Sequence, residues 1–384
     1  MKKYTMIFGA SVLMLGACSP EEPQEEESEE TTDGGSDELG EDDPTEGEPE
    51  PADDEDIDED EMAGDYETLA ENLAAPWGIT LVDDGTVYVT EREGQIIEIT
   101  DGETTPMSLA LDEEVHQEGE GGLHGMVLHP EDEDTAIIYH TYVATDGIYN
   151  RIVEIERDGD EWQETDVLIE DIPGATTHNG GRLAIGPDGY LYATTGDAED
   201  PELSQDTDSL AGKILRMNLD GTVAEDNPFD DSYVYSYGHR NPQGLDWTDD
   251  DRLFSTEHGP TANDEINHIE PGNNYGWPEI VGDETEEGME TAVMNSGEET
   301  WAPSGAAMVG EQSFYVAALA GEQLIRFDVD DNTTDTILEG EGRWRDVVYD
   351  ENENMFYVIT NNTDGRGDPI DEDDRLLRFE GPEA

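Results

Sequence analysis

The sequence is poor in basic residues and has a single cysteine. Its 384 residues include 16 Lys and Arg against 101 Asp and Glu, which gives a formal net charge of −85. A chain with this charge repels nucleic-acid phosphates and anionic lipid head groups. The composition therefore excludes proteins that bind nucleic acids or anionic membranes through basic patches. Because Cys18 is the only cysteine, no disulfide can form within the chain.

Long hydrophobic runs are also missing. The apolar stretch at residues 6–15 is too short to span a bilayer. It follows two lysines and ends in Leu15-Gly16-Ala17-Cys18, which is typical of an export signal and resembles the lipobox of bacterial lipoproteins. We therefore expect residues 1–18 to be a lipoprotein signal peptide. The mature protein would be exported and held by a lipid on Cys18 at the outer face of the cytoplasmic membrane. An ordinary signal peptide with a chance cysteine is the alternative.

The next segment, residues 19–65, is dominated by acids. It holds 25 Asp and Glu and no Lys or Arg, among Pro, Gly, Ser and Thr. Low apolar content and self-repulsion predict a disordered acidic linker. As a flexible coil it would span roughly 40 Å, enough to hold the rest of the chain clear of a membrane.

Residues 66–384 remain strongly acidic, with 76 acids against 14 bases. Self-repulsion of this size destabilises a compact state in dilute buffer, and concentrated salt screens it. We interpret the composition as a halophilic surface, while an acidic field that attracts a cationic partner is the alternative. The same charge opposes association except at high salt, so both a monomer and a dimer stay open.

Short β-rich runs recur along residues 66–384, each opened by an Asp, Gly or Asn turn and followed by a second strand. The first strands are expected at 86–90, 136–140, 190–194, 252–256, 313–317 and 355–359, and their partners at 95–99, 151–155, 213–217, 265–269, 323–327 and 375–379. One pair per roughly 53 residues matches the repeat length of a four-stranded propeller blade. We therefore predict an all-β, six-bladed β-propeller over residues 66–384. A pair of β-sandwiches is the alternative, but it gives no reason for the sixfold recurrence.

Loops that face the channel of a propeller are the expected place for reactive side chains. Although bases are scarce, four arginines lie in or beside Gly-rich loops: Arg182, Arg240, Arg343 and Arg345. Guanidinium groups are permanently charged and pair with carboxylates, so a cluster of them fits a polyanionic small molecule. Relief of local acid repulsion is the alternative role for each. Lys213, the only lysine after the signal segment, we interpret as structural.

Several ordered motifs resemble the soluble, pyrroloquinoline-quinone-dependent aldose dehydrogenases of the glucose/sorbosone type, which are six-bladed propellers. The resemblance covers about residues 69–380, and its motifs lie at 75–79, 89–92, 119–125, 178–183, 237–245, 257–278 and 343–347. The ordered set is far more specific than any one motif. It implies pyrroloquinoline quinone and Ca²⁺ as cofactors, oxidation of an aldose at C1 to a lactone, and an external electron acceptor.

The resemblance also implies roles for individual residues. His178 matches the general base that takes the proton of the anomeric hydroxyl, and imidazole suits this task because its ordinary pKa is near working pH. Arg240 and Asn241 match the pair that holds the quinone, with Arg240 stabilising negative charge on its reacting carbonyl. Arg343 and Arg345 match a pair that clamps the quinone near its carboxylates, and their i, i+2 spacing places both on one face of a strand.

Two calcium sites are implied in the same way. The backbone carbonyls of Gly259 and Pro260 match those that hold the Ca²⁺ beside the quinone, and carbonyl oxygens suit a hard cation. Glu265 and the backbone carbonyl of Tyr275 match a second, structural Ca²⁺ site. For Glu265, a solvated acidic loop is the alternative.

Two positions depart from the family pattern. Glu120 occupies a quinone-binding position where the family often has Gln, and its carboxylate would repel an anionic cofactor unless Arg240 or calcium offsets it. Ala320 occupies a position where many members offer a Lys to the quinone. Loss of that ammonium should weaken quinone binding by about 1–3 kcal/mol.

Two other functions suit a propeller of this size. A metal-dependent lactonase would need a carboxylate and Asn cage in the channel, and the arginines at 240, 343 and 345 argue against it. A cofactor-free carbohydrate-binding propeller is favoured by Ala320, whereas His178 and the Arg240-Asn241 pair favour an enzyme.

Overall fold

The computed structural model describes residues 66–382. The expected signal peptide (1–18) and acidic linker (19–65) lie outside these residues. The described residues all belong to one compact unit. Among residues 66–382, no helix has the length and apolar character needed to cross a bilayer.

The described chain consists of β-strands and loops, with one short 3-10 helix, η2 (Pro201–Gln205), within residues 66–382. The strands are β1 (Glu67–Ala70), β2 (Pro76–Leu81), β3 (Val87–Glu91), β4 (Gln95–Thr100), β5 (Glu103–Ala110), β6 (Leu123–His129), β7 (Asp132–Val143), β8 (Ile148–Asp158), β9 (Glu161–Pro173), β10 (Leu183–Ile185), β11 (Leu191–Thr195), β12 (Lys213–Met217), β13 (Val234–Tyr237), β14 (Pro242–Trp247), β15 (Leu253–Glu257), β16 (Glu265–Ile269), β17 (Met294–Asn295), β18 (Pro303–Val309), β19 (Ser313–Ala318), β20 (Gln323–Asp328), β21 (Thr333–Glu339), β22 (Trp344–Asp350), β23 (Met355–Thr360) and β24 (Leu376–Glu380).

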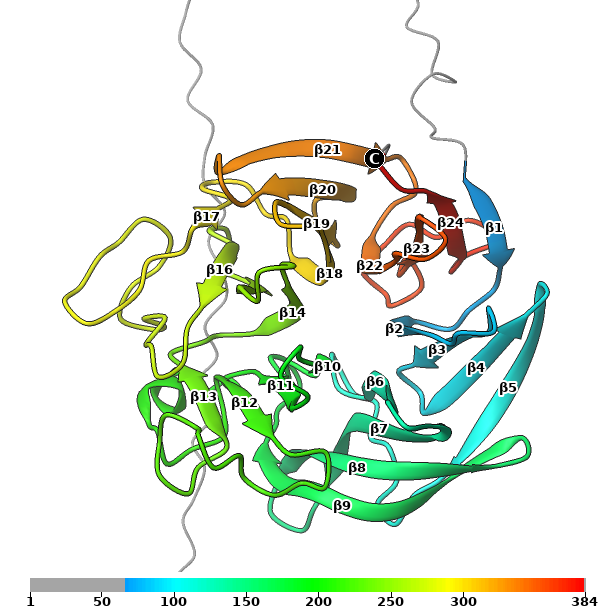
Figure 1. Cartoon of the computed structure of the whole chain (residues 1–384), viewed down its shortest axis with the longest axis horizontal. Coiled ribbons are helices and arrows are strands. Elements are labelled where there is room, and N and C mark those ends of the chain that lie inside the picture. The colour runs from blue at the N-terminus through cyan, green and yellow to red at the C-terminus, as the bar shows by residue number, and fades with distance from the viewer. Residues whose placement is uncertain (1–65, 383–384) are drawn as a thin grey trace, which may run out of the picture. The chain divides into compact units, whose positions relative to one another are not determined.

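The sheets of the described unit surround a common centre (Figure 1). Four of them have four strands, in the orders β1-β24-β23-β22, β10-β11-β12-β13, β14-β15-β16-β17 and β18-β19-β20-β21. A further sheet has eight strands, in the order β2-β3-β4-β5-β9-β8-β7-β6, where the parallel pair β5–β9 joins two antiparallel groups of four. The innermost strands β2, β6, β10, β14, β18 and β22 contact one another in this order, and β22 contacts β2, so they close a ring.

The prediction of an all-β, propeller-like fold is confirmed. Each of the strand pairs expected from the sequence is an antiparallel pair in the structure: β3–β4, β7–β8, β11–β12, β15–β16, β19–β20 and β23–β24. Most observed ends lie within one residue of the expected ones, but β7 and β8 are longer by several residues. The first and last strands of the described chain, β1 and β24, pair with each other in one sheet.

Apolar clusters between neighbouring sheets form the core. One cluster joins Ile137 and Tyr139 of β7 to Leu191 of β11 and Leu215 of β12. Every residue of β11 is buried, because neighbouring sheets cover both faces of this strand. Burial of apolar surface, at about 25 cal/mol per Å², stabilises this packing of neighbouring sheets. The packed sheets in turn hold the loops at the ends of the inner strands in place.

Lys213 lies in this buried region. Its ammonium donates hydrogen bonds to the backbone carbonyls of Leu203 at 2.9 Å, Ser204 at 3.1 Å and Ala211 at 2.6 Å. These three acceptors tie η2 to the start of β12. The geometry supports the interpretation of Lys213 as a structural residue.

Candidate functional site

Loops that lead into the innermost strands bring the predicted site residues together. The loop before β6 carries Glu120, the loop before β10 carries His178, and the loop before β14 carries Arg240 and Asn241. A small cavity between these loops is lined by Glu120, His258 and Arg345, with other residues of the same motifs. Residues that are far apart in the sequence therefore meet at one end of the ring.

His178 has a buried carboxylate partner. Its Nδ1 lies 2.7 Å from Oδ1 of Asp197, whose side chain is 1% exposed. The other oxygen of Asp197 accepts a hydrogen bond from the indole N–H of Trp277 at 2.9 Å. A carboxylate on Nδ1 favours the tautomer that leaves Nε2 with a free lone pair. The imidazole is 19% exposed, so this lone pair is within reach of a substrate proton.

The backbone of His178 is held from two other loops. Its φ of +57° lies in the left-handed region, which is uncommon for a residue other than glycine. Its N–H donates to Oε2 of Glu120 at 3.1 Å, and the N–H of Gly180 donates to Oδ1 of Asn241 at 3.0 Å. Gly180 also has a positive φ, and a Cβ there would lie 2.6 Å from the carbonyl oxygen of Thr194, so the position requires glycine.

Arg240 is connected to the His178 and Asp197 pair through the backbone of Asp197. Its guanidinium donates to the backbone carbonyl of His258 at 3.1 Å and lies 5.4 Å from the centre of the Trp277 ring. The backbone N–H of Asp197 donates to the carbonyl of Arg240 at 2.8 Å, which couples the two loops directly. Burial lowers the pKa of Arg240 from its ordinary value, and nearby carboxylates partly oppose this effect.

Arg343 and Arg345, at the start of β22, are both buried but have different partners. Arg345 lines the cavity and donates from NH1 to Oε1 of Gln243 at 2.9 Å. Burial, together with repulsion from Arg92, lowers the pKa of Arg345 to about 9. Arg343 instead donates to the backbone carbonyl of Leu319 at 3.4 Å.

The arginines of the site are short of negative partners. Ten of the thirteen arginines of the chain form a salt bridge with Asp or Glu. Arg92, Arg240 and Arg345 form none within residues 66–382, and all three border the site. Acidic residues far outnumber arginines in this chain, so an arginine without a carboxylate partner is unusual. Three such arginines at one place indicate a site that attracts an anion.

Buried polar atoms without hydrogen-bond partners also gather at this site. At the site they are Arg92 Nε, His124 Nδ1, Asn241 Nδ2, His258 Nε2, Arg343 Nε and Arg345 Nε, and others lie elsewhere in the described residues. Because Nε2 of His124 donates to the carbonyl of Glu120, its Nδ1 is an acceptor, whereas the Arg and Asn atoms are donors. Each buried, unpaired donor costs about 1–3 kcal/mol, so a ligand that accepts hydrogen bonds would relieve the cost. The donor set, made largely of guanidinium and amide N–H groups, fits a polycarboxylate such as pyrroloquinoline quinone.

The four residues predicted as metal ligands border one cavity. Gly259, Pro260, Glu265 and Tyr275 line it together with Arg240. Burial, with a contribution from the charge of a nearby carboxylate, raises the pKa of Glu265 to about 8, and a bound cation would favour its ionised form. Within residues 66–382 no three His, Cys, Asp or Glu side chains are placed to hold a metal ion. A cation here would therefore take backbone carbonyls as most of its protein ligands.

Glu120 is neutralised by a residue that the sequence reasoning missed. Its Oε1 lies 2.8 Å from NH1 of Arg366, so neither Arg240 nor calcium is needed to offset its charge. Burial alone would raise the pKa of Glu120, but His258 in its protonated form and the Arg366 guanidinium lower it below its ordinary value. Because burial lowers the pKa of His258 to about 4, Arg366 is the partner that is charged near neutral pH. Arg366 lies in Asp364-Gly365-Arg366-Gly367, so the criterion of an arginine in a Gly-rich loop would have found it. Asp197 had no such signal.

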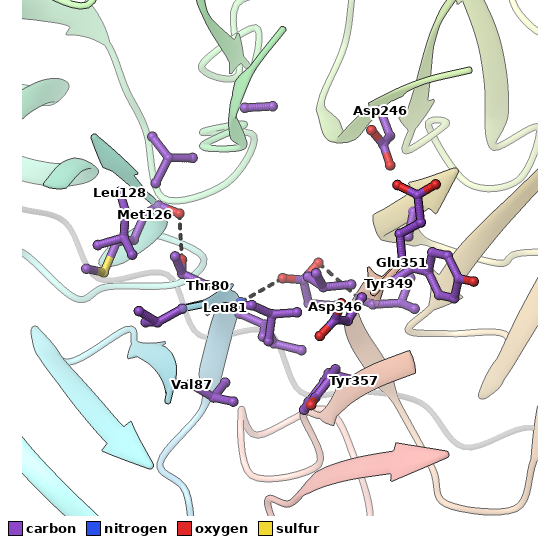
Figure 2. A pocket seen from close by; sticks show the side chains of 18 of the residues that line it. Thr80, Leu81, Val87, Met126, Leu128, Asp246, Asp346, Tyr349, Glu351 and Tyr357 are labelled. Carbon is purple, nitrogen blue, oxygen red and sulfur yellow. Dashed lines mark hydrogen bonds between the residues drawn. The ribbon is translucent and has the colours of Figure 1, made fainter. Parts of the chain in front are cut away.

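Arg182, the remaining arginine of the predicted cluster, faces a different cavity. It pairs with Asp346 at 3.0 Å and stacks 4.4 Å from the ring of Trp77. The cavity that it lines has a volume of about 800 Å³ and is bordered by the second halves of β2, β6 and β22. Figure 2 shows Thr80, Met126 and Asp346 among its lining residues. There Asp246 accepts the N–H of Met308 at 2.6 Å, so its carboxylate links neighbouring sheets. We assign no chemistry to this second cavity.

Comparisons with known proteins give one family match and several similar chains. The model of the glucose/sorbosone dehydrogenase family matches residues 73–377. The chain is 31% identical over 253 residues to quinoprotein glucose dehydrogenase B of Acinetobacter calcoaceticus, covering 57% of this chain and 53% of that protein. It is 34% identical over 228 residues to an aldose sugar dehydrogenase of Escherichia coli, covering 55% of this chain and 61% of that one. The chain thus spans little more than half the length of these curated relatives.

A solved structure is similar over almost its whole length. The PQQ-bound aldose sugar dehydrogenase of Streptomyces coelicolor is 40% identical, with a TM-score of 0.76 over 82% of this chain and 96% of that one. The family match covers most of the described residues, including the stretch in which the ordered motifs lie. The chain belongs to the glucose/sorbosone dehydrogenase family.

Proposed function

We propose that this protein oxidises aldose sugars at C1 to lactones, with pyrroloquinoline quinone and Ca²⁺ as cofactors. The observation that carries this proposal is that the His178 and Asp197 pair is joined to the loop of Arg240, one of three arginines at the site that lack carboxylate partners. A base alone fits many reactions, but a base next to an anion-binding cluster fits an anionic redox cofactor. The names of the relatives support the same reaction class.

In the proposed reaction, Nε2 of His178 takes the proton of the anomeric hydroxyl. Asp197 stabilises the imidazolium that forms, because its carboxylate accepts the Nδ1–H bond in a buried place. The quinone, when bound, supplies the acceptor for the two electrons and the hydrogen that leave C1. Arg240 and Asn241 would hold it, with the Arg240 guanidinium offsetting negative charge as it develops.

We assign the cofactor-bound Ca²⁺ to the backbone carbonyls of Gly259 and Pro260. Glu265 and the carbonyl of Tyr275 would hold a second, structural Ca²⁺. The hydroxyl of Tyr275 donates to the carbonyl of His268 at 2.7 Å, so the phenol is already engaged and leaves the backbone oxygen for a cation. Hard oxygen ligands of this kind suit Ca²⁺.

Dye-linked aldose oxidation tests the proposal. The purified full-length chain would be stripped with a chelator and assayed in concentrated salt, with the quinone and Ca²⁺ added separately and together. We expect turnover of several aldoses only when both are present, with less than about 1% of that rate when either is omitted. Absence of activity together with absence of quinone binding would contradict the proposal and favour a carbohydrate-binding propeller.

We further propose that the described unit is a six-bladed propeller. Dividing the eight-stranded sheet at its parallel β5–β9 pair leaves two groups of four strands, which together with the other four sheets make six blades.

For residues 1–65 we retain the proposals of a lipoprotein signal, an acidic linker and a lipid anchor on Cys18. Replacing Cys18 with serine should release the protein from the membrane fraction, and its retention there would contradict the anchor.

The proposed halophilic surface predicts stability that depends on salt. Raising KCl from about 0.1 M to about 2 M shortens the Debye length from about 10 Å to less than about 3 Å, so repulsion between surface carboxylates falls. The melting temperature measured by circular dichroism should therefore rise steadily across this range. A melting temperature that stays constant or falls would contradict the proposal.

A further inference from the structure

We propose that Arg366 is a cofactor-binding residue, whose guanidinium pairs with a carboxylate of the quinone while Glu120 holds it in place. The inference rests on the proposed function above. Arg366 lies in the loop between β23 and β24, and Glu120 lies in the loop before β6, 246 residues away. Their side chains meet at 2.8 Å, and both line the cavity that Arg345 lines.

Most hydrogen-bond donors of the Arg366 guanidinium are unused among the described residues. Its guanidinium carries five N–H donors, and NH1 alone makes a hydrogen bond to another described residue. The side chain is 48% exposed, whereas that of Glu120 is 17% exposed. The guanidinium can therefore take a second carboxylate without losing Glu120, as a fork of donors allows.

The loop that carries Arg366 is anchored beside the arginine predicted to clamp the quinone. Oδ1 of Asp364 accepts the N–H of Arg366 at 2.9 Å, and Oδ2 of Asp364 lies 3.5 Å from NH2 of Arg343. A Cβ on Gly367 would come within 2.9 Å of Cδ of Arg343, so the loop packs directly on this side chain. Although its side chain is half exposed, Arg366 is therefore held next to Arg343 by the contacts of its own loop.

The charges around the cavity leave a place for the guanidinium of Arg366. The same cavity is lined by Leu319, next to Ala320, so the loop that matches the family's lysine position brings no cation to it. Glu120 adds a negative charge where an anionic ligand is expected. Arg366 cancels that charge, and its remaining N–H donors stay available to a carboxylate of the ligand. Glu120 in turn accepts the N–H of His178 at 3.1 Å, which connects this pair to the base.

A cycle of variants tests direct contact against simple neutralisation of Glu120. The dissociation constant of the quinone would be measured by quenching of tryptophan fluorescence, in Ca²⁺ and high salt, with the full-length wild type, Arg366→Gln, Glu120→Gln and the double variant. Trp77 lines the cavity and serves as the reporter. Arg326→Gln is the matched control, because Arg326 pairs with Asp328 and Asp335 on β20 and β21 and carries the same charge.

We expect Arg366→Gln to weaken quinone binding by about 10- to 100-fold, the size of a lost charge-assisted contact. Glu120→Gln should tighten it a few-fold, since it removes a negative charge and keeps an oxygen for the His178 N–H. The double variant should bind at least about tenfold more weakly than Glu120→Gln, and the control should stay within about twofold of wild type.

Three results would overturn the inference. If the double variant binds as tightly as Glu120→Gln alone, Arg366 only neutralises Glu120. If Arg366→Gln binds like the control, it has no role in binding. If both single variants weaken binding and lower the melting temperature alike, the pair is structural. Failure of the wild type to bind quinone is a separate result, which overturns the proposed function together with this inference.

Discussion

Replacing His178 with alanine should lower kcat for aldose oxidation by about 10²–10⁴, the range expected for loss of a general base. The quinone should still bind with a dissociation constant within about threefold of wild type, because the imidazole takes part in proton transfer and not in holding the cofactor. Stopped-flow reduction of the bound cofactor by an aldose would measure the chemical step directly. Fluorescence titration of the same preparation would give the affinity.

The matched control for this variant is His129→Ala. His129 lies at the end of β6, where its Nδ1 accepts only the N–H of Glu131 at 3.3 Å among the described residues. Its loss should leave kcat unchanged. Asp197→Asn should fall between the two, since it keeps the shape of the partner but favours the wrong tautomer of the base. An unchanged kcat in His178→Ala would remove this residue from the mechanism.

Replacing Arg345 with methionine should weaken quinone binding by about 10- to 150-fold, as expected for a buried hydrogen bond to a charged group. The same change should leave the free energy of unfolding of the cofactor-free protein unchanged or raise it. Arg345 is buried, lacks a carboxylate partner within the described residues and has an unpaired Nε, so its charge is costly until an anion arrives. Affinity and stability should thus move in opposite directions.

Denaturant titration with and without the quinone would measure both quantities for Arg345→Met. Arg326→Met is the control, because Arg326 is partly exposed and paired with Asp328 and Asp335. It should change neither quantity by more than about 0.5 kcal/mol. A fall in the stability of Arg345→Met with unchanged quinone affinity would show that Arg345 is a packing residue.

The strand pairs were predictable because alternation and turn residues are local in the sequence. Lys213–Met217 and Glu265–Ile269 were expected with the bounds that the structure gives. The parallel contact between β5 and β9 had no local signal, since it depends on how two sheets meet. Motif resemblance selected His178, Arg240 and Asn241, which the structure places in the loops before β10 and β14, while their roles stay predictions.

The partners of those residues were much harder to predict. Asp197 is one of 101 acids, and nothing in its local sequence marks it as the residue that meets His178. Arg366 and Glu120 lie in loops from different sheets, and only the closed ring brings them together. The shared face expected for Arg343 and Arg345 does not give them shared partners, because side chains at the start of a strand follow their own contacts.

The pairing of β1 with β24 has a consequence for how the protein folds. The ribosome makes β1 first among the described strands, yet its partner is the last strand to be made. The register joins Glu67 to Arg378, a separation that spans nearly the whole unit. The entropy of closing so long a loop must be lost before the contacts between β1 and β24 can stabilise the fold. The ring therefore cannot lock until synthesis of β24 is complete, and a chain truncated before β24 should expose the edges of both β1 and β23 to solvent and to other chains.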